Sequence, residues 1–535
     1  MCKINTRSML AIGLDYGSTN SLVVSFVPNM SGGVPRTHSK SEVRLDNEYI
    51  RSPKRLLHNI DRATTEEIEV VQHCIKQCVR EMLIHHLQGA GSVGRTGSSN
   101  ACDMAATGDD VVHMAITVPN AFKDRECVVL KKAVEEDAIE IFGRIAMGNG
   151  GDRRATPEVV MSLIPEPVAA ALYFAYAMNG IGALQQVQYV VVSDVGGGTT
   201  DLALVKVVAA YGRLEFEVVH TEHMFSLGGN DIDNAIADYM LDRRPELRSI
   251  DREVLVKACC ELKVGFSRYG GQEYSEVTVL GVDASVVEID GEEVVLEMSR
   301  DELRDVLSQG GGFLSKYRAL AEELKAKLGK VSHSSLYLLP VGGTSRLSLV
   351  RDVLRDVFAQ YRDCEVELNT EKAQVGSNDG ACYDSVVRGA AIYAAYKAGC
   401  LKQSVVIKNR TMHRISLCYG DNRLHECVMQ CSSDGHYDCR CRCESTYLNQ
   451  SEGWFKIGAI RLYQGGGGSH IDDDCVLLCE VMIDDKLYLH GRNLESVGVN
   501  VRLDVRGGRL YSIEVRAEGC CADGSDFVRR IECEI

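Results

Sequence analysis

Apolar residues follow two different periods along the first 400 residues of the chain. Residues 64–88 repeat apolar side chains every three or four positions after a threonine and two acids, which predicts an amphipathic helix. Largely apolar runs at residues 111–118 and 189–192 predict buried strands. Strand and helix patterns alternate through residue 397, and this alternation predicts an α/β architecture.

The pattern changes after residue 400, where helical periodicity ends. Short alternating runs separated by Gly and Asp predict strands at residues 414–419, 456–463, 476–483, 499–505 and 510–517. We therefore expect an α/β domain over residues 1–400, a linker over 401–410 and an all-β sandwich over 411–535, whose size is ordinary for a domain.

Composition and charge limit the classes of function. A length of 535 residues with 45% hydrophobic residues predicts more than one folded domain. A net charge of −16 disfavours nucleic acid as the main partner, because phosphate binding requires an excess of Lys and Arg. The sequence shows neither an apolar run long enough to cross a membrane nor a signal peptide, so we expect a cytoplasmic protein without a membrane partner.

The 21 cysteines allow two interpretations in the C-terminal part. Alternation at residues 439, 441 and 443 predicts three thiols on one face of a strand. A zinc site is one interpretation, but the segment has no paired C-x-x-C spacing, which favours buried or merely tolerated thiols. Cys74 and Cys78 fall on the apolar face of the predicted helix and are expected to pack as small hydrophobic residues.

The strongest chemical signal is the segment YVVVSDVGGGTTDLAL at residues 189–204. It predicts a strand, a glycine turn and a second strand, with an acid at each shoulder of the turn. Consecutive glycines let backbone N–H groups approach a phosphate, and two carboxylates suit a hydrated Mg²⁺. A tight hairpin with solvated acids is the plainer alternative. Residues 11–20, AIGLDYGSTN, repeat the same chemistry, which favours two similar lobes that bind one polyphosphate.

Several ordered segments resemble one protein family. LDYGSTNSLV and DVGGGTTD resemble its two phosphate loops, and IPEPVAAALYFAYA and RGAAIYAAYKAG resemble its two connecting helices. LLPVGGTSRLSLVRDVL resembles its adenosine loop. FSLGGNDIDNAI and ITVPNAFKDRE favour the chaperone branch. The chain is thus similar to the actin-like ATPase superfamily, and within it to the seventy-kilodalton heat-shock chaperone family (DnaK-type), which implies a two-lobed fold with ribonuclease-H-like subdomains.

The resemblance implies a set of site residues and cofactors. The expected cofactors are ATP or ADP with Mg²⁺, and K⁺ is a further candidate. Asp15 and Asp194 are expected to hold Mg²⁺ through water. The residues expected to act in catalysis are Lys54, Glu166, Asp194, Thr199 and Asp201. The residues expected to bind the nucleotide are Asp15, Gly17, Ser18, Thr19, Asn20, Gly196, Gly197, Gly198, Gly228, Gly229, Lys263, Ser267, Gly342, Gly343, Thr344, Ser345 and Arg346.

The chain also departs from the family pattern. Cys260 stands where the family's adenine clamp has glutamate, and Cys127 stands where an arginine is expected near Pro119. The acidic, leucine-rich linker is replaced by LKQSVVIKNR at residues 401–410. We expect the family's helical lid to be missing. These differences disfavour ATP-controlled peptide release more than they disfavour hydrolysis.

Three functions remain open. The first is a chaperone-type ATPase in stress response and protein folding, which engages unfolded or extended polypeptides with a J-domain co-chaperone and a nucleotide-exchange factor as partners. The second is a non-catalytic or weakly catalytic nucleotide-switched interaction protein. The third, a filament-forming actin relative or a sugar kinase, is disfavoured by the β-rich C-terminal part and the LGGNDID segment.

Overall fold

The structure is a computed structural model of the whole chain. It describes residues 9–17, 20–26, 36–40, 42–45, 48–51, 57, 60, 63–89, 111–120, 122, 124–147, 156–180, 184, 186–210, 212–268, 274–279, 294–328, 336–359, 362–363, 384–401, 404–408, 415–418, 424–426, 430–431, 436–442, 447–449, 451–464, 476–490, 498–506 and 509–532.

The chain divides into two compact units. Unit 1 consists of Met1–His58, Thr64–Asn120 and Leu130–Lys408. Unit 2 consists of Asn59–Ala63, Ala121–Val129 and Asn409–Ile535. The domain limits expected at residues 400 and 410 stay predictions.

Unit 1 contains a five-stranded sheet of order β3-β2-β1-β6-β7. β1 pairs in parallel with β6, and β6 pairs in parallel with β7, whereas β2 is antiparallel to β1. The bounds of β6 confirm the strand predicted at residues 111–118. The strands are β1 (Met9–Asp15), β2 (Asn20–Phe26), β3 (Arg36–Lys40), β6 (Val111–Val118) and β7 (Glu158–Pro165), and a separate hairpin joins β4 (Glu42–Leu45) to β5 (Glu48–Arg51).

The second sheet of unit 1 is a six-stranded mixed sheet of order β14-β13-β8-β9-β10-β15. Successive side chains of a strand point to opposite faces, and here both faces are covered. Val190 and Val192 of β8 join one apolar cluster, whereas Val191 and Val195 join another. Burial on both faces explains the continuous apolar run of β8. The strands are β8 (Val187–Val195), β9 (Thr199–Ala210), β10 (Arg213–Phe225), β13 (Leu336–Val341), β14 (Arg362–Asp363) and β15 (Ser404–Lys408).

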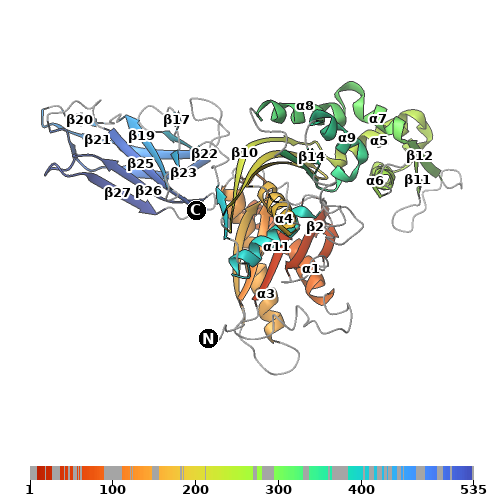
Figure 1. The fold of residues 1–535 in the computed structure, drawn as a ribbon, viewed down its shortest axis with the longest axis horizontal. Helices are drawn as coiled ribbons and strands as arrows, with labels where there is room; N and C mark the ends of the chain where they lie inside the picture. Colours follow the sequence, from red (N-terminus) through yellow and green to blue (C-terminus); the bar gives the residue numbers. More distant parts are fainter. Residues whose placement is uncertain are drawn as a thin grey trace. The chain divides into compact units, whose positions relative to one another are not determined.

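Two apolar helices, α4 (Glu166–Gly180) and α11 (Ser385–Lys397), lie side by side and connect the two sheets (Figure 1). One buried cluster includes residues of both helices and of both sheets. The helices approach so closely that a Cβ on Gly389 of α11 would overlap the carbonyl oxygen of Ala169. A Cβ on Gly13 of β1 would overlap the backbone of α11 in the same way. Both predicted connecting helices are therefore present.

Helix α1 (Thr65–Gly89) begins with a capping box, which confirms the helix start predicted from sequence. Thr64 Oγ1 accepts the backbone N–H of Glu67 at 3.3 Å, and Glu67 Oε2 accepts the N–H of Thr64 at 2.7 Å. Cys74 and Cys78 are buried in this helix with free thiols, as expected of small hydrophobic residues.

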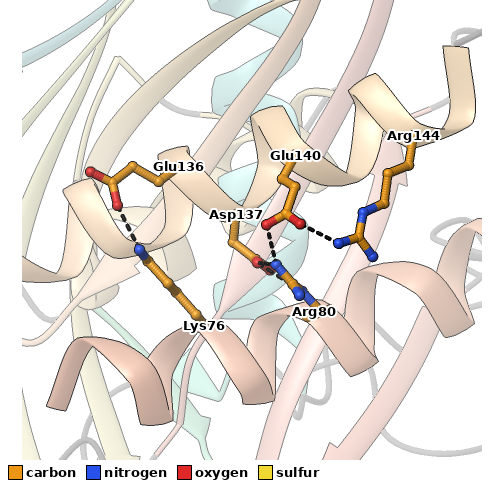
Figure 2. A network of polar contacts seen from close by, with 6 residues as sticks. All are labelled: Lys76, Arg80, Glu136, Asp137, Glu140 and Arg144. Atoms are coloured by element: carbon orange, nitrogen blue, oxygen red, sulfur yellow. Dashed lines mark hydrogen bonds and ion pairs between the residues drawn. The ribbon is translucent and has the colours of Figure 1, made fainter. Parts of the chain in front are cut away.

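Charged side chains join α1 to α3 (Asp124–Met147), as Figure 2 shows. Arg80 Nε donates to Asp137 Oδ1 at 2.9 Å, and the Asp137 side chain is fully buried. Burial raises the pKa of the Asp137 carboxyl, and the Arg80 guanidinium offsets part of this rise. The network also contains the pairs Lys76–Glu136, Arg80–Glu140 and Arg144–Glu140.

The remaining helices of unit 1 pack against the second sheet or on one another. They are α5 (Gly229–Arg243), α6 (Arg252–Arg268), α7 (Arg300–Ser308), α8 (Phe313–Ala326) and α9 (Ser348–Val357), together with the hairpin of β11 (Tyr274–Val279) and β12 (Val294–Ser299). α7 starts with a second capping box, in which the N–H of Ser299 donates to Glu302 Oε2 at 2.9 Å. This hydrogen bond lowers the pKa of Glu302 to about 2.

Part of the predicted linker forms an edge strand. β15 pairs in parallel with β10, with Val405 beside Leu214 and Ile407 beside Phe216. Lys408 also forms an ion pair with Glu215 at 2.5 Å. The apolar run at residues 405–407 therefore completes the second sheet.

Unit 2 contains sheets of order β17-β16-β22-β23, β18-β19-β25-β26-β27 and β20-β21-β24. The predicted strand at residues 476–483 is confirmed with the same bounds, and the sandwich arrangement stays a prediction. The strands are β16 (Ile415–Cys418), β17 (Leu424–Glu426), β18 (Gln430–Cys431), β19 (His436–Arg442), β20 (Tyr447–Asn449), β21 (Trp454–Lys456), β22 (Gly458–Gln464), β23 (Val476–Ile483), β24 (Leu487–Tyr488), β25 (Gly498–Arg506), β26 (Arg509–Ala517) and β27 (Phe527–Glu532). Among the described residues, no helix has the length and apolarity needed to cross a membrane.

Candidate functional site

The hairpin between β8 and β9 carries the glycine turn predicted from sequence. The N–H of Gly196 donates to the carbonyl of Thr199 at 3.0 Å and closes the turn. The register pairs Asp194 with Asp201 directly across the two strands. Directly opposed residues of an antiparallel pair point to the same face, so the structure brings the two predicted carboxylates together.

The start of α5 is bonded to this turn. The N–H of Gly229 donates to the carbonyl of Gly196 at 3.0 Å, and the N–H of Asn230 donates to the carbonyl of Gly197 at 2.7 Å. A Cβ on Gly228 would lie 2.7 Å from the carbonyl carbon of Gly197, which is closer than real Cβ contacts. Glycine at residue 228 is therefore required by the close approach of two backbones.

The loop that follows β13 contacts the same turn. Gly342 has a φ of +83°, and a Cβ there would overlap Asp194 Oδ1 and lie 2.6 Å from the carbonyl oxygen of Val195. Thr344 Oγ1 donates to the carbonyl oxygen of Gly196 at 2.8 Å. Nearby, Ser345 is buried, whereas Gly343 is exposed and Arg346 is half-buried. The residues expected at the adenosine thus adjoin the predicted phosphate turn.

Lys263 of α6 is nearly buried and tied to α5. Its Nζ lies 2.7 Å from Asp233 Oδ1 and donates to the carbonyl of Gly229 at 2.9 Å. Burial raises the pKa of the Asp233 carboxyl, and the Lys263 charge opposes this rise. Ser267 Oγ donates to the carbonyl of Lys263 at 3.3 Å. Both residues expected in the adenine clamp therefore also have bonds within the protein.

The first sheet supplies another carboxylate. Asp15 is half-buried at the end of β1, and Thr117 Oγ1 donates to Asp15 Oδ1 at 2.7 Å. Glu166 is the first residue of α4 and is 8% exposed. Gly17 is half-buried two residues after Asp15. β6 lies between β1 and β7 in the sheet. Asp15 is the last residue of β1, and Glu166 comes directly after β7, so both acids lie where a strand beside β6 ends.

Some expected residues lie outside the described part of the chain. Lys54, Ser18 and Thr19 are among them, and for Asn20 the structure gives only the backbone at the start of β2. Of the cysteines expected on one strand face, Cys439 and Cys441 lie in β19, and Cys443 is outside the description. Within the described residues, no group of three His, Cys, Asp or Glu side chains could hold a metal ion directly.

Two site residues were missed by sequence reasoning. Asp233 pairs with Lys263, and Thr117 donates to Asp15. Asp233 lies in the LGGNDID segment, next to the predicted glycines, so an acid one turn into the helix was an available signal. Thr117 lies inside an apolar strand and gave no signal.

The residues present fit a nucleotide with a hydrated divalent cation. Gly228 and Gly342 approach the turn so closely that a Cβ on either would clash with it or with the end of β8. Glycine turns of this kind offer N–H groups to phosphate oxygens. The carboxylates of Asp15, Asp194 and Asp201 are oxygen donors of the kind that Mg²⁺ holds through its water shell.

Comparison with known proteins agrees with this geometry. Residues 100–409, more than half of the chain, match the family model described as Hsp70 protein. The chain belongs to the Hsp70 family, whose members have the actin-like ATPase fold. It is 26% identical over 261 residues to a protein of Methylococcus capsulatus named "Chaperone protein HscA homolog". That alignment covers 48% of this chain and 35% of the relative.

Proposed function

We propose that this chain is an ATP-binding and ATP-hydrolysing, chaperone-like protein that engages unfolded or extended polypeptide. The observation that carries the proposal is the bonding of the α5 start and of the Gly342 loop to the Gly196–Gly198 turn. Only glycine fits at these approaches. Membership of the Hsp70 family supports the same conclusion.

Each part of the site has a separate task in this proposal. The backbone of Gly196–Gly198 and the hydroxyl of Thr199 bind phosphate oxygens, and the loop after Gly342 packs against the adenosine. Asp15, Asp194 and Asp201 hold the water shell of Mg²⁺, which supplies neutralisation of phosphate charge.

The hydrolytic step is proposed to depend on positioning. Asp194 and Asp201 share one face of the hairpin, so their carboxylates can accept hydrogen bonds from a single attacking water. Glu166, the first residue of α4, extends this polar network. Lys54 orients the water toward the γ-phosphate. The protein contributes fixed groups rather than a covalent intermediate.

The polypeptide-binding part of the proposal rests on the strands of unit 2 and on the family. Unfolded polypeptides, a J-domain co-chaperone and a nucleotide-exchange factor are the proposed partners. The affinity for an extended peptide, measured with ATP, with ADP and without nucleotide, tests this part. Equal affinity under the three conditions would show that nucleotide does not control peptide binding.

ATP turnover by the purified protein tests the catalytic part. Lys54→Ala should abolish most turnover while nucleotide binding stays measurable. Lys257→Ala, which removes an exposed lysine of α6, is the matched control and should leave turnover unchanged. Equal turnover by the Lys54 variant and the wild type would reject the assigned role.

A second function is favoured by one observation. Cys260 replaces the glutamate of the adenine clamp, so the nucleoside side of the site differs from the family pattern. A nucleotide-switched interaction protein with little catalysis agrees with this difference. Stimulation of hydrolysis by a J-domain or by an unfolded peptide would support the ATPase and count against this alternative.

A further inference from the structure

The hydroxyl of Thr117 holds the carboxylate at the end of the neighbouring strand. β1 and β6 pair in parallel up to Leu14 and Ile116, so Asp15 and Thr117 are the next residues along the two strands. Their side chains meet in the 2.7 Å hydrogen bond from Thr117 Oγ1 to Asp15 Oδ1. Thr117 is fully buried, whereas Asp15 is half-buried.

This contact restricts the orientation of the carboxylate. An aspartate side chain rotates about two bonds, and a hydrogen bond to its charged oxygen favours one arrangement. The donor itself has little freedom, because a β-branched residue inside a strand has a restricted χ1. One oxygen of Asp15 is therefore held from the buried side, which fixes the direction of the other oxygen.

We propose that Thr117 is a positioning residue of the nucleotide–metal site, and that its hydroxyl orients Asp15 toward the water shell of Mg²⁺. The inference rests on the proposed function, in which Asp15 contacts that shell. Mg²⁺ requires near-ideal octahedral geometry and keeps several waters, so a carboxylate that bonds to those waters must be held in place. A merely structural hydroxyl would stabilise the fold without changing the response to Mg²⁺.

Three variants separate these roles. Thr117→Val removes the donor and keeps the size and branching of the side chain, and Thr117→Ser keeps the hydroxyl. Ser25→Ala is the matched control, because Ser25 is another buried hydroxyl of the same sheet and is bonded to His86 at 2.8 Å. If Thr117→Val does not fold, Thr117→Cys replaces it, because a thiol is only a weak donor.

The measurement is the dissociation constant of ADP, by titration calorimetry, in Mg²⁺ and in EDTA. The gain in ADP affinity that Mg²⁺ provides should fall about tenfold in Thr117→Val, with unchanged affinity in EDTA. Thr117→Ser should restore most of the gain, and Ser25→Ala should retain all of it.

The outcomes distinguish this inference from the proposed function. If Thr117→Val keeps the full Mg²⁺-dependent gain, or loses affinity equally in EDTA, the positioning role is wrong while the proposed function stands. An equal loss in Ser25→Ala would assign the effect to general destabilisation and also overturn the inference. If the wild-type protein shows no Mg²⁺-dependent gain, the proposed function itself fails.

Discussion

Replacement of Gly342 by alanine tests the construction of the site at its most constrained backbone position. Gly342 has a φ of +83°, and a Cβ at this position would overlap Asp194 Oδ1 and the Val195 carbonyl oxygen. An alanine must therefore adopt a strained backbone conformation and displace at least one of these neighbours. The carboxylate is the more mobile of the two, so Asp194 is expected to move.

The expected cost has two parts. The left-handed conformation costs an alanine about 1–2 kcal/mol relative to glycine. Overpacking against a fixed carbonyl adds about 1–3 kcal/mol. Gly399→Ala is the matched control, because Gly399 also lies in unit 1 with a φ of +75°, and a Cβ there would meet nothing within 4 Å. The control should show only the first part.

The assay is chemical unfolding followed by two signals. The helical circular-dichroism signal reports mainly on unit 1, whereas the fluorescence of the single tryptophan, Trp454, reports on unit 2. Gly342→Ala should destabilise unit 1 more than Gly399→Ala does and should weaken the binding of Mg·ADP. Equal destabilisation by the two variants, with unchanged binding, would refute the reasoning from close approach.

Three further predictions concern stability. Arg80→Ala leaves Asp137 buried without its cation and should lower the free energy of unfolding by about 3 kcal/mol at neutral pH. Because burial raises the pKa of Asp137, this loss of stability should shrink as pH falls toward about 4. Unfolding curves at several pH values check this expectation. Glu302→Gln should lower the free energy of unfolding by about 1 kcal/mol after allowance for solvent screening. Because the pKa of Glu302 is lowered in the folded state, the difference in stability from wild type should disappear as pH falls from about 4.5 toward 2. A difference that stays constant over this range would contradict the role of the Glu302 charge at the start of α7. Gly389→Ala should lower the free energy of unfolding by at least about 2 kcal/mol, because the alanine Cβ would overlap the Ala169 carbonyl. If the variant has the thermal stability of the wild type, α4 and α11 can separate without loss of stability.

Local sequence patterns predicted much of the α/β part. The strand at residues 111–118 and the helix that starts after Thr64 have the expected bounds or nearly so, because burial and capping act within a few residues. The helix that begins at Asp124 continues through Gly143 to Met147. Gly143 does not end this helix, because a single glycine weakens a helix without stopping it.

Partners that come from distant parts of the chain were harder to predict. The apolar run at residues 405–407 was expected to be linker, and it is a strand because the edge of β10 is available for pairing. The sequence does not show which edge is free. The hydrogen bond between Thr117 and Asp15 was hard to predict for the same reason. It depends on the parallel register of β1 and β6, which come from distant parts of the chain.

Within the site, the sequence predicted residue types better than their surroundings. The glycines and the Asp194–Asp201 pair were predicted from the turn chemistry and from the family resemblance. The resemblance also predicted Lys263, but its burial against Asp233 depends on how α5 and α6 pack. Packing of this kind is set by many weak contacts along both helices, and no short motif encodes it.

Titration of the purified chain with Mg·ATP tests the account most directly. We expect saturable heat at a one-to-one ratio and a rise in the unfolding midpoint of unit 1, since a ligand at 100 times its dissociation constant stabilises the folded state by about 2.7 kcal/mol. The Trp454 transition of unit 2 provides an internal comparison. A titration that releases no heat and leaves both transitions unmoved would contradict the assignment of the glycine turn, the α5 start and the Gly342 loop to a nucleotide.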